Sequence, residues 1–453
     1  MQERLVSDFY KNDAPAYGSA DNIRKIASYI DGFKLSARKL IYTMFEKYQN
    51  SQIKTAQFAN FCAAFTNYNQ GENNLGGVAS GLAQDFCGSN NFPPLKGKGN
   101  FGNRLDPLPA ATRYTYVSQG EFLKSIFDET DRKLVSNQIY EGDKIEPKFY
   151  VPVLPFLLLN GSDGLSTGFR QLIYPRNYND IILYIKKKIS GIENPKIDFL
   201  PWFNGYKGSI RTNQDGQIEI VGAIERKNTT NYFISEIPIT TQYSKYCEFL
   251  DKLCEDNVIV DYDDKCDPKT NNIMFEIKTT RAFTSAHEDT ESLYKVFRLV
   301  KPISENLNCI DENNRIREFS SIKEIINSFI ELRLSFYNKR KDYLLKTFKH
   351  DLEILVSKYL WCKGIIDKKI IVANKKKEEI VKQIESNEKI VKIDDSYQYL
   401  LNMSIASITK EKIDELYNQI KEKKEEFIKV KSTDIKNMWL DDLKKIEKEF
   451  KKN

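Results

Sequence analysis

The chain has 453 residues, of which 41% are hydrophobic and 29% charged, enough for two to four domains with real cores. Its 69 basic and 63 acidic residues give a net charge of +6, which excludes a polycation, so any nucleic-acid surface must come from local clustering. Seven cysteines without a C-x-x-C pair, and only two histidines, argue against a disulfide framework and a structural zinc site. No run approaches the ~20 apolar residues of a membrane span, so we expect a cytoplasmic protein with no membrane partner.

Residues 21–48 are predicted to be helical, with a break at Asp31-Gly32. After the break, an apolar stripe at helical spacing must face a core: Leu40, Ile41, Met44 and Phe45. Lys34 and Arg38 are four residues apart and would share another face of the same helix. A positive ridge over a small apolar core is typical of helix-turn-helix and winged-helix DNA binders. The alternative, a solvated charged face, stays open.

The middle of the chain reads as mixed strands and helices. Residues 148–173 are strongly apolar and predict a buried strand that enters a glycine turn. Residues 206–240 alternate like strands, and Asp215-Gly216 predicts a hairpin turn between them. A helix is expected over residues 243–256. The acids of Asp261-Tyr262-Asp263-Asp264 could in principle hold a metal, but without alternating strands and helices around them they predict a solvated turn.

From Ser321 onward the pattern becomes that of long helices. Apolar residues step by three and four, which is the seam of a coiled coil: Ile322, Ile325, Phe329, Leu332 and Phe336. A second long helical segment is predicted from Thr409 to Phe450, and a short apolar unit at residues 392–407 lies between the two. Two long helices with a small head between them form a hairpin.

The stretch from Gly97 to Tyr116 combines a glycine-rich turn with a tyrosine that follows an arginine, Arg113-Tyr114. Four cations stand in or beside it, against the single acid Asp106: Lys96, Lys98, Arg104 and Arg113. The G-x-G-x-x-G spacing also fits a dinucleotide fingerprint. That alternative needs a preceding strand, and the preceding Pro93-Pro94 cannot donate to a sheet ladder.

This stretch resembles the active-site segment of type II (type IIA) DNA topoisomerases, in which a glycine loop leads to A-A-x-R-Y. The resemblance continues in other segments in the same order: residues 31–39, 88–91, 160–168, 201–208 and 399–440. It covers most of residues 20–450 and indicates the DNA breakage-reunion subunit, similar to the gyrase A protein and to the eukaryotic topoisomerase II cleavage core. Within the family, the chain most resembles the medium subunit of a tailed-phage topoisomerase.

The resemblance implies an α+β multidomain fold. Its parts would be a winged-helix DNA-cleavage domain (residues 1–165), an α/β tower domain (166–318), and a long antiparallel coiled coil (319–453) with a small helical dimer-gate head at about 380–410. It implies an ATP-dependent enzyme that makes a transient double-strand break through a 5'-phosphotyrosine link, passes a strand and religates. Tyr114 would be the nucleophile and Arg113 its neighbouring stabiliser.

The resemblance also implies a set of DNA contacts, in which Leu165 takes the place of the family's intercalating isoleucine. Asn69 and Gln70 stand where relatives usually carry histidine; their amides can donate to phosphate but cannot carry a proton as imidazole does. The full set is Arg24, Lys34, Arg38, Lys39, Asn69, Gln70, Lys98, Asn100 and Leu165.

No metal site is expected in this chain. The chain shows no Walker A motif and its one D-x-D has a poor context, so Mg²⁺ and ATP are expected to be bound by an ATPase/Toprim partner subunit. The other expected partners are double-stranded DNA and a second copy of the chain, joined through the coiled-coil gate and the cleavage domain. If the chain is phage-encoded, it would act in the bacterial host cytoplasm. The alternative is a non-catalytic dimeric DNA-binding coiled-coil protein.

Overall fold

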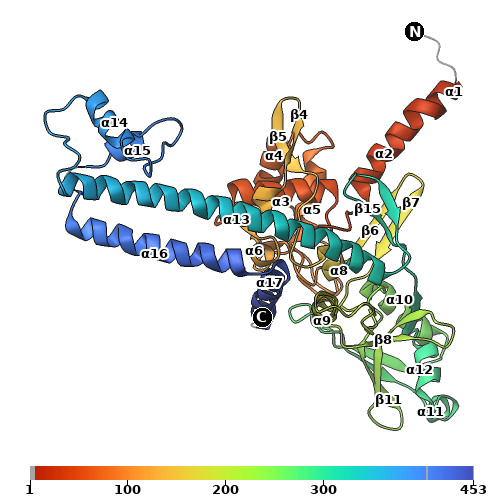
Figure 1. Ribbon diagram of the computed structural model, residues 1–453. Coiled ribbons are helices and arrows are strands. Elements are labelled where there is room, and N and C mark those ends of the chain that lie inside the picture. Colours follow the sequence, from red (N-terminus) through yellow and green to blue (C-terminus); the bar gives the residue numbers. More distant parts are fainter. Residues whose placement is uncertain (1–5, 405–406, 452–453) are drawn as a thin grey trace. The chain divides into compact units, whose positions relative to one another are not determined.

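The computed structural model describes residues 6–404 and 407–451 and shows a mixed α/β protein (Figure 1). The chain divides into two compact units, residues 1–333 with 442–453, and residues 334–441. Among the described residues, no helix is long and apolar enough to cross a bilayer. The predicted mixture of helices and strands is therefore confirmed.

The first unit begins with α1 (Val6–Asp8), a short π-helix (Phe9–Asp13) and α2 (Ala14–Lys25), followed by α3 (Leu35–Lys47), α4 (Thr55–Phe65) and α5 (Glu72–Leu82). A small antiparallel sheet joins them in the order β1 (Ile53–Lys54), β3 (Tyr116–Gln119), β2 (Leu95–Lys98). The predicted apolar stripe of α3 is fully buried. The predicted helix break is confirmed and covers residues 26–34, where Gly32 adopts a φ of +70° that favours glycine.

The next elements are α6 (Leu123–Ile126), α7 (Glu129–Leu134), a hairpin of β4 (Asn137–Tyr140) and β5 (Asp143–Pro147), and the five-residue helix α8 (Phe156–Asn160). A second hairpin, β6 (Ser162–Ser166) with β7 (Phe169–Ile173), comes before α9 (Tyr178–Ile189). The buried strand predicted within residues 148–173 is therefore wrong at α8. A short apolar run cannot be assigned to strand or helix from periodicity alone.

Two further sheets follow in this unit. One has the order β10 (Ala223–Arg226), β11 (Asn231–Glu236), β13 (Phe275–Lys278), β12 (Asp261–Asp264), and the other β14 (Val300–Ile303), β9 (Ile218–Val221), β8 (Ser209–Thr212). The predicted turn at residues 215–216 joins β8 to β9. The turn predicted for residues 261–264 is wrong: this segment is the edge strand β12, whose Asp261 and Asp263 both pair with Lys278 of β13.

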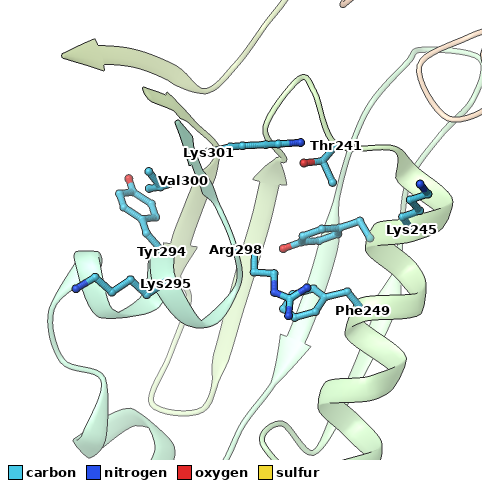
Figure 2. A pocket seen from close by; sticks show the side chains of 9 residues that line it. Thr241, Lys245, Phe249, Tyr294, Lys295, Arg298, Val300 and Lys301 are labelled. Atoms are coloured by element: carbon cyan, nitrogen blue, oxygen red, sulfur yellow. The ribbon is translucent and has the colours of Figure 1, made fainter. Parts of the chain in front are cut away.

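Helices α10 (Tyr243–Glu255), α11 (Arg281–Ala286) and α12 (Thr290–Val296) accompany these sheets, and the hairpin of β15 (Asn308–Ile310) and β16 (Ile316–Glu318) follows. The predicted helix at residues 243–256 is thus confirmed. The core beside α10 is apolar and aromatic, with Tyr232, Leu250 and Phe275 almost fully buried. A hollow of about 590 Å³ opens beside α10, α12 and β14 (Figure 2).

The second unit contains most of α13 (Ile322–Ile366) and α16 (Lys410–Ser432), with α14 (Lys377–Glu385) and α15 (Gln398–Leu401) between them. The two long helices run antiparallel, because contacts pair Lys341 with Thr433, Phe348 with Lys423, and Tyr359 with Tyr417. The small helices share a core with both long helices. The predicted helical hairpin is confirmed, although its second arm breaks before α17 (Ile435–Phe450), and residues 405–406 of the expected head lie outside the described residues.

Candidate functional site

Tyr114 lies at the end of the loop, residues 99–115, that joins β2 to β3. Its side chain is 67% exposed, whereas the next residue, Thr115, is fully buried. Tyr116 begins β3, where it pairs with Lys98 of β2 on one side and Lys54 of β1 on the other. The tyrosine ring therefore projects from a position just outside a small sheet.

The backbone on both sides of Tyr114 is fixed by the start of α4. The Thr55 N–H donates to the Thr115 carbonyl at 2.9 Å, and the Ala56 N–H donates to the Thr112 carbonyl at 3.2 Å. The hydroxyl groups of Thr115 and Thr55 form a buried hydrogen bond of 2.8 Å. Since the first N–H groups of a helix have no partner within the helix, this loop satisfies two of them. The phenol is exposed on an anchored backbone.

Arg113 contributes a cation directly beside the phenol. Its guanidinium carbon lies 4.9 Å from the centroid of the Tyr114 ring, and its side chain is also exposed. A guanidinium presents several N–H donors in a fixed fork that matches a phosphate group. The pair therefore places a potential oxygen nucleophile and a phosphate-binding group side by side at the surface.

The glycine loop before Tyr114 is tightly folded. Gly102 adopts a φ of +86°, and a Cβ built on it would lie 2.6 Å from the backbone of Pro107, so a larger residue does not fit. The loop closes through Ala110 N–H, which donates to the Asn100 carbonyl at 3.0 Å, and through Gln84, whose amide donates to the carbonyls of residues 101 and 107. The loop is thus a defined structure.

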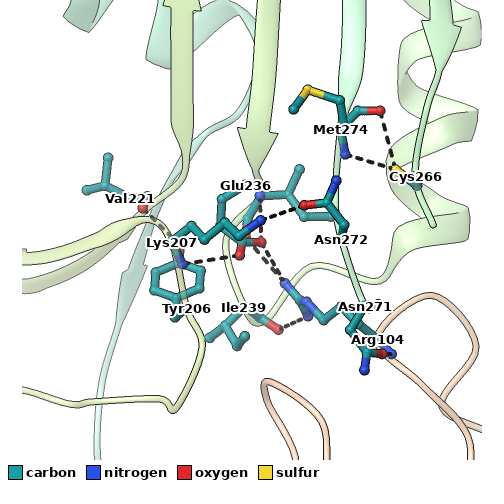
Figure 3. A network of polar contacts seen from close by, with 11 residues as sticks. Arg104, Tyr206, Lys207, Val221, Glu236, Ile239, Cys266, Asn271, Asn272 and Met274 are labelled. Carbon is teal, nitrogen blue, oxygen red and sulfur yellow. Dashed lines mark hydrogen bonds and ion pairs between the residues drawn. The ribbon is translucent and has the colours of Figure 1, made fainter. Parts of the chain in front are cut away.

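Arg104 ties this loop to the larger sheet, as Figure 3 shows. Its side chain donates to the carbonyls of Ile237 and Ile239 and lies 3.5 Å from the Glu236 carboxylate, while its own N–H donates to the side chain of Asn271 at 2.8 Å. The residue is largely buried. Its charge serves the fold, a role that its position among four cations in the sequence did not indicate.

Lys98, at the end of β2, and Asn100, in the loop that follows, are both exposed. Arg24, Asn69 and Gln70 come together elsewhere, at a hollow of about 580 Å³ that is also lined by Lys39. The Arg24 guanidinium donates to the Gln70 side chain at 2.6 Å, and Gln70 donates to Asn69 at 3.0 Å. The Asn69 and Gln70 amides are therefore held next to the positive charge of Arg24.

Arg38 and Lys39 correct the expected exposed ridge on α3, because both side chains are about 95% buried. Arg38 donates to the Asp31 carboxylate at 2.7 and 2.9 Å and to the Phe33 carbonyl at 2.9 Å. Lys39 donates to Glu146 at 2.9 Å and to the Thr66 carbonyl at 2.7 Å. Buried charges that are paired in this way support the fold and are not available to a DNA backbone.

Leu165 lies near the tip of the β6–β7 hairpin and is 72% exposed. The hairpin is fixed to α2: the Asp21 carboxylate accepts from the N–H and hydroxyl of Thr167. Although burial raises the pKa of Asp21, hydrogen bonds from Lys25, Arg24 and Thr167 lower it to about 2. The apolar side chain is therefore held on a supported tip.

Lys34 reaches this hairpin, since its ammonium group donates to the Asp163 carbonyl. Partial burial lowers the pKa of Lys34. Of the nine predicted DNA-binding residues, the structure brings Lys34 next to the Leu165 hairpin, and it groups Arg24, Asn69 and Gln70 at one hollow. Asn100 belongs to the loop of Tyr114, and Lys98 is the last residue of β2 before it.

The described residues do not offer a metal site. Among residues 6–404 and 407–451, no group of three or more His, Cys, Asp or Glu side chains is arranged to hold an ion.

Comparisons with known proteins agree with this arrangement. The family model for the A protein of DNA gyrase/topoisomerase IV matches residues 24–444. A solved structure of the DNA-binding, cleavage and re-ligation domain of Plasmodium falciparum topoisomerase II superposes with a TM-score of 0.89 at 32% identity, covering 98% of this chain and 64% of that one. The fold and the exposed tyrosine thus define a type II topoisomerase cleavage core. The chain belongs to the family of the DNA gyrase/topoisomerase IV A protein.

Curated relatives include the mitochondrial DNA topoisomerase 2 of Dictyostelium discoideum, 33% identical over 100% of this chain and 36% of the relative. DNA topoisomerase 2 of Plasmodium falciparum is 32% identical over 98% of this chain and 34% of the relative. The chain therefore spans about a third of the length of these relatives. These relatives are eukaryotic, so they give no support to the expected phage branch.

Proposed function

We propose that this chain is the DNA-cleaving part of an ATP-dependent type II DNA topoisomerase. The observation that carries the proposal is Tyr114, an exposed phenol on an anchored backbone with the Arg113 guanidinium 4.9 Å from its ring, in a member of this family.

In the proposed reaction, the Tyr114 oxygen attacks a DNA phosphorus atom. The bond from this oxygen to phosphorus forms, the bond from phosphorus to the 3'-oxygen breaks, and the 3'-oxygen takes up a proton. One phosphodiester is exchanged for another, so religation is the reverse step and needs no outside energy. A free phenol has a pKa of about 10 and must lose its proton to react.

Arg113 is proposed to bind the phosphate oxygens on which negative charge gathers during this step. Removal of one such donor from an active site typically costs about 3–4 kcal/mol of transition-state stabilisation. Lys98 at the end of β2 and Asn100 in the loop after it would hold neighbouring phosphates, and Arg24 with Asn69 and Gln70 would hold others. Arg38 and Lys39 are left out of this contact surface because they are buried in ion pairs.

Leu165 is proposed to enter between base pairs and bend the duplex. Apolar side chains that unstack a base step do so at a cost of about a few kcal/mol, which contacts along the bent DNA return. Leu165 is suited to this because it is 72% exposed on a hairpin that Thr167 ties to α2.

The finer architecture is also part of the proposal: a winged-helix cleavage domain over residues 1–165, a tower domain over 166–318, and a coiled coil with a dimer-gate head over 319–453. A break in both strands needs two copies of Tyr114, so we propose a homodimer. Mg²⁺ and ATP would be held by ATPase and Toprim parts outside the residues described here, on a partner subunit or on the same polypeptide as in longer relatives. A cytoplasmic site of action and a phage origin remain predictions.

The direct test is trapping of the cleaved intermediate. The chain is mixed with an ATPase/Toprim partner, Mg²⁺ and supercoiled plasmid, and denaturant is added. We expect linear DNA that resists a 5'-exonuclease and is digested by a 3'-exonuclease, because protein covers the 5' ends. Binding without any covalent adduct would support the non-catalytic alternative. Without the partner, we expect no ATP-dependent relaxation.

A further inference from the structure

A second concave surface lies far in sequence from the cleavage residues. Its hollow of about 590 Å³ is within the ~300–1,000 Å³ that small-ligand pockets usually have. Four cations from α10, α12, the turn after α12 and β14 line it (Figure 2): Lys245, Lys295, Arg298 and Lys301. Of the described residues that line it, none is acidic. The hollow therefore has a positive wall in a chain whose net charge is only +6.

Among the described residues, none of these four cations forms an ion pair within 4.0 Å, although Glu291 interacts with Lys295 at longer range. Glu291, one helical turn before Lys295 on α12, is held by Arg211 through two hydrogen bonds of 2.6 and 3.0 Å. Lys301 donates to the Thr240 carbonyl at 3.2 Å, a contact that leaves its charge uncompensated. Four unpaired like charges around one hollow repel one another, and a bound anion would remove that repulsion.

Arg298 occupies a backbone position that favours glycine. Its φ is +50°, a region in which most other non-glycine residues of this chain are Asn or Asp. It closes α12, with its N–H donating to the Lys295 carbonyl and the next N–H, of Leu299, donating to the Tyr294 carbonyl. Helix ends of this kind usually carry glycine. A non-glycine residue in this region is strained, so the backbone alone does not favour an arginine here.

The Arg298 side chain is also oriented toward the hollow. Its guanidinium carbon lies 4.3 Å from the centroid of the Phe249 ring, which fixes the fork at the wall. Tyr294 lines the same hollow with a second aromatic ring. Cations in the lining, one prepositioned fork and nearby aromatic rings match a ligand that carries several phosphoryl groups.

We propose that this hollow is a binding site for a phosphoryl anion, separate from the DNA contacts assigned to cleavage. Two sources carry this chemistry, a free nucleotide and the sugar-phosphate backbone of a nucleic acid. Arg298 and the three lysines would bind the phosphate oxygens from either source, and the Tyr294 ring would contact the sugar or base.

The test uses the full chain and calorimetric titration with inorganic tripolyphosphate and with ATP, at low salt. The variant carries Lys295→Gln and Arg298→Gly, because glycine adopts the required φ and keeps the turn. Lys252→Gln, on the exposed side of α10 and outside the hollow, is the matched control. Each lost charge-assisted hydrogen bond weakens binding by about tenfold or more, so we expect at least that loss in the variant and none in the control.

A competition experiment with a DNA duplex of about 40 bp distinguishes a free nucleotide from a nucleic-acid backbone as the natural ligand. The site is assigned to nucleic acid if this duplex displaces tripolyphosphate and if the log–log salt slope of duplex binding is lower by about two in the variant. Tighter binding of ATP than of tripolyphosphate, with no displacement by the duplex, assigns it to a free nucleotide. The proposal is overturned if tripolyphosphate does not bind the wild-type chain, or if the variant binds it as tightly as the wild type does. An unchanged melting temperature in the variant verifies that it is folded.

Discussion

Replacement of Arg38 by methionine tests whether this cation stabilises the fold or contacts DNA. Arg38 is buried, and its guanidinium donates three hydrogen bonds, two to Asp31 and one to the Phe33 carbonyl. After Arg38→Met, the fully buried Asp31 carboxylate keeps two backbone donors, the N–H groups of Phe33 at 3.1 Å and Tyr150 at 3.0 Å. Removal of one partner from a buried ion pair costs about 3–5 kcal/mol, so we expect the free energy of unfolding to fall by that amount.

The measurement is urea unfolding of wild type, Arg38→Met, Asp31→Asn and the double variant. The double variant should be less destabilised than the sum of the single changes, because it removes both buried charges. Lys98→Gln, an exposed substitution, should change the free energy of unfolding by less than about 0.5 kcal/mol. If Arg38→Met is as stable as wild type and instead lowers the salt slope of DNA binding by about 0.9, Arg38 is a DNA contact and the reasoning is refuted.

The remaining predictions concern the exposed residues and the Asp21 carboxylate. Leu165→Ala should reduce DNA bending, measured by end-to-end FRET on a labelled duplex, with a smaller loss of affinity; unchanged bending would remove Leu165 from the proposed wedge. Lys98→Gln should lower the log–log salt slope of binding by about 0.9, and an unchanged slope would return Lys98 to an ordinary solvated lysine. Because the pKa of Asp21 is lowered from 3.8 to about 2, its carboxylate stabilises the fold above pH 3.8 and loses this effect as the pH falls toward 2. Asp21→Asn should therefore show a smaller loss of melting temperature over that pH range, and an equal loss would contradict the assignment.

The local sequence pattern was sufficient to predict much of the secondary structure. The apolar stripe of α3, the turn at residues 215–216 and the two long helices all follow from periodicity and turn chemistry within a short window. The pattern failed at Phe156–Asn160, where an apolar run formed a helix. It failed again at Asp261–Asp264, where pairing with β13 and the ammonium group of Lys278 make a strand out of an acidic segment. At Asp261–Asp264, the residues that determine the strand structure lie in another strand, β13.

The same distinction holds for the site. The family resemblance implied roles for Tyr114 and Leu165, and the structure shows both side chains exposed, although their roles remain predictions. The motif did not separate Lys98, which is exposed, from Arg38, which is buried, because burial depends on Asp31 and on segments such as residues 149–151 that pack there. Nor did it indicate that Arg104 binds a distant sheet. A cation's role is set by the acids around it, and these come from anywhere in the chain.

The most direct test of the proposed function compares Tyr114→Phe with Tyr116→Phe in the trapped cleavage reaction. Both substitutions remove one hydroxyl, but Tyr114 is 67% exposed at the loop end, whereas Tyr116 lies within the sheet between β1 and β2. We predict that Tyr114→Phe abolishes the covalent protein–DNA adduct and keeps noncovalent DNA binding, and that Tyr116→Phe still forms the adduct. An adduct that persists in Tyr114→Phe and disappears in Tyr116→Phe would contradict the account.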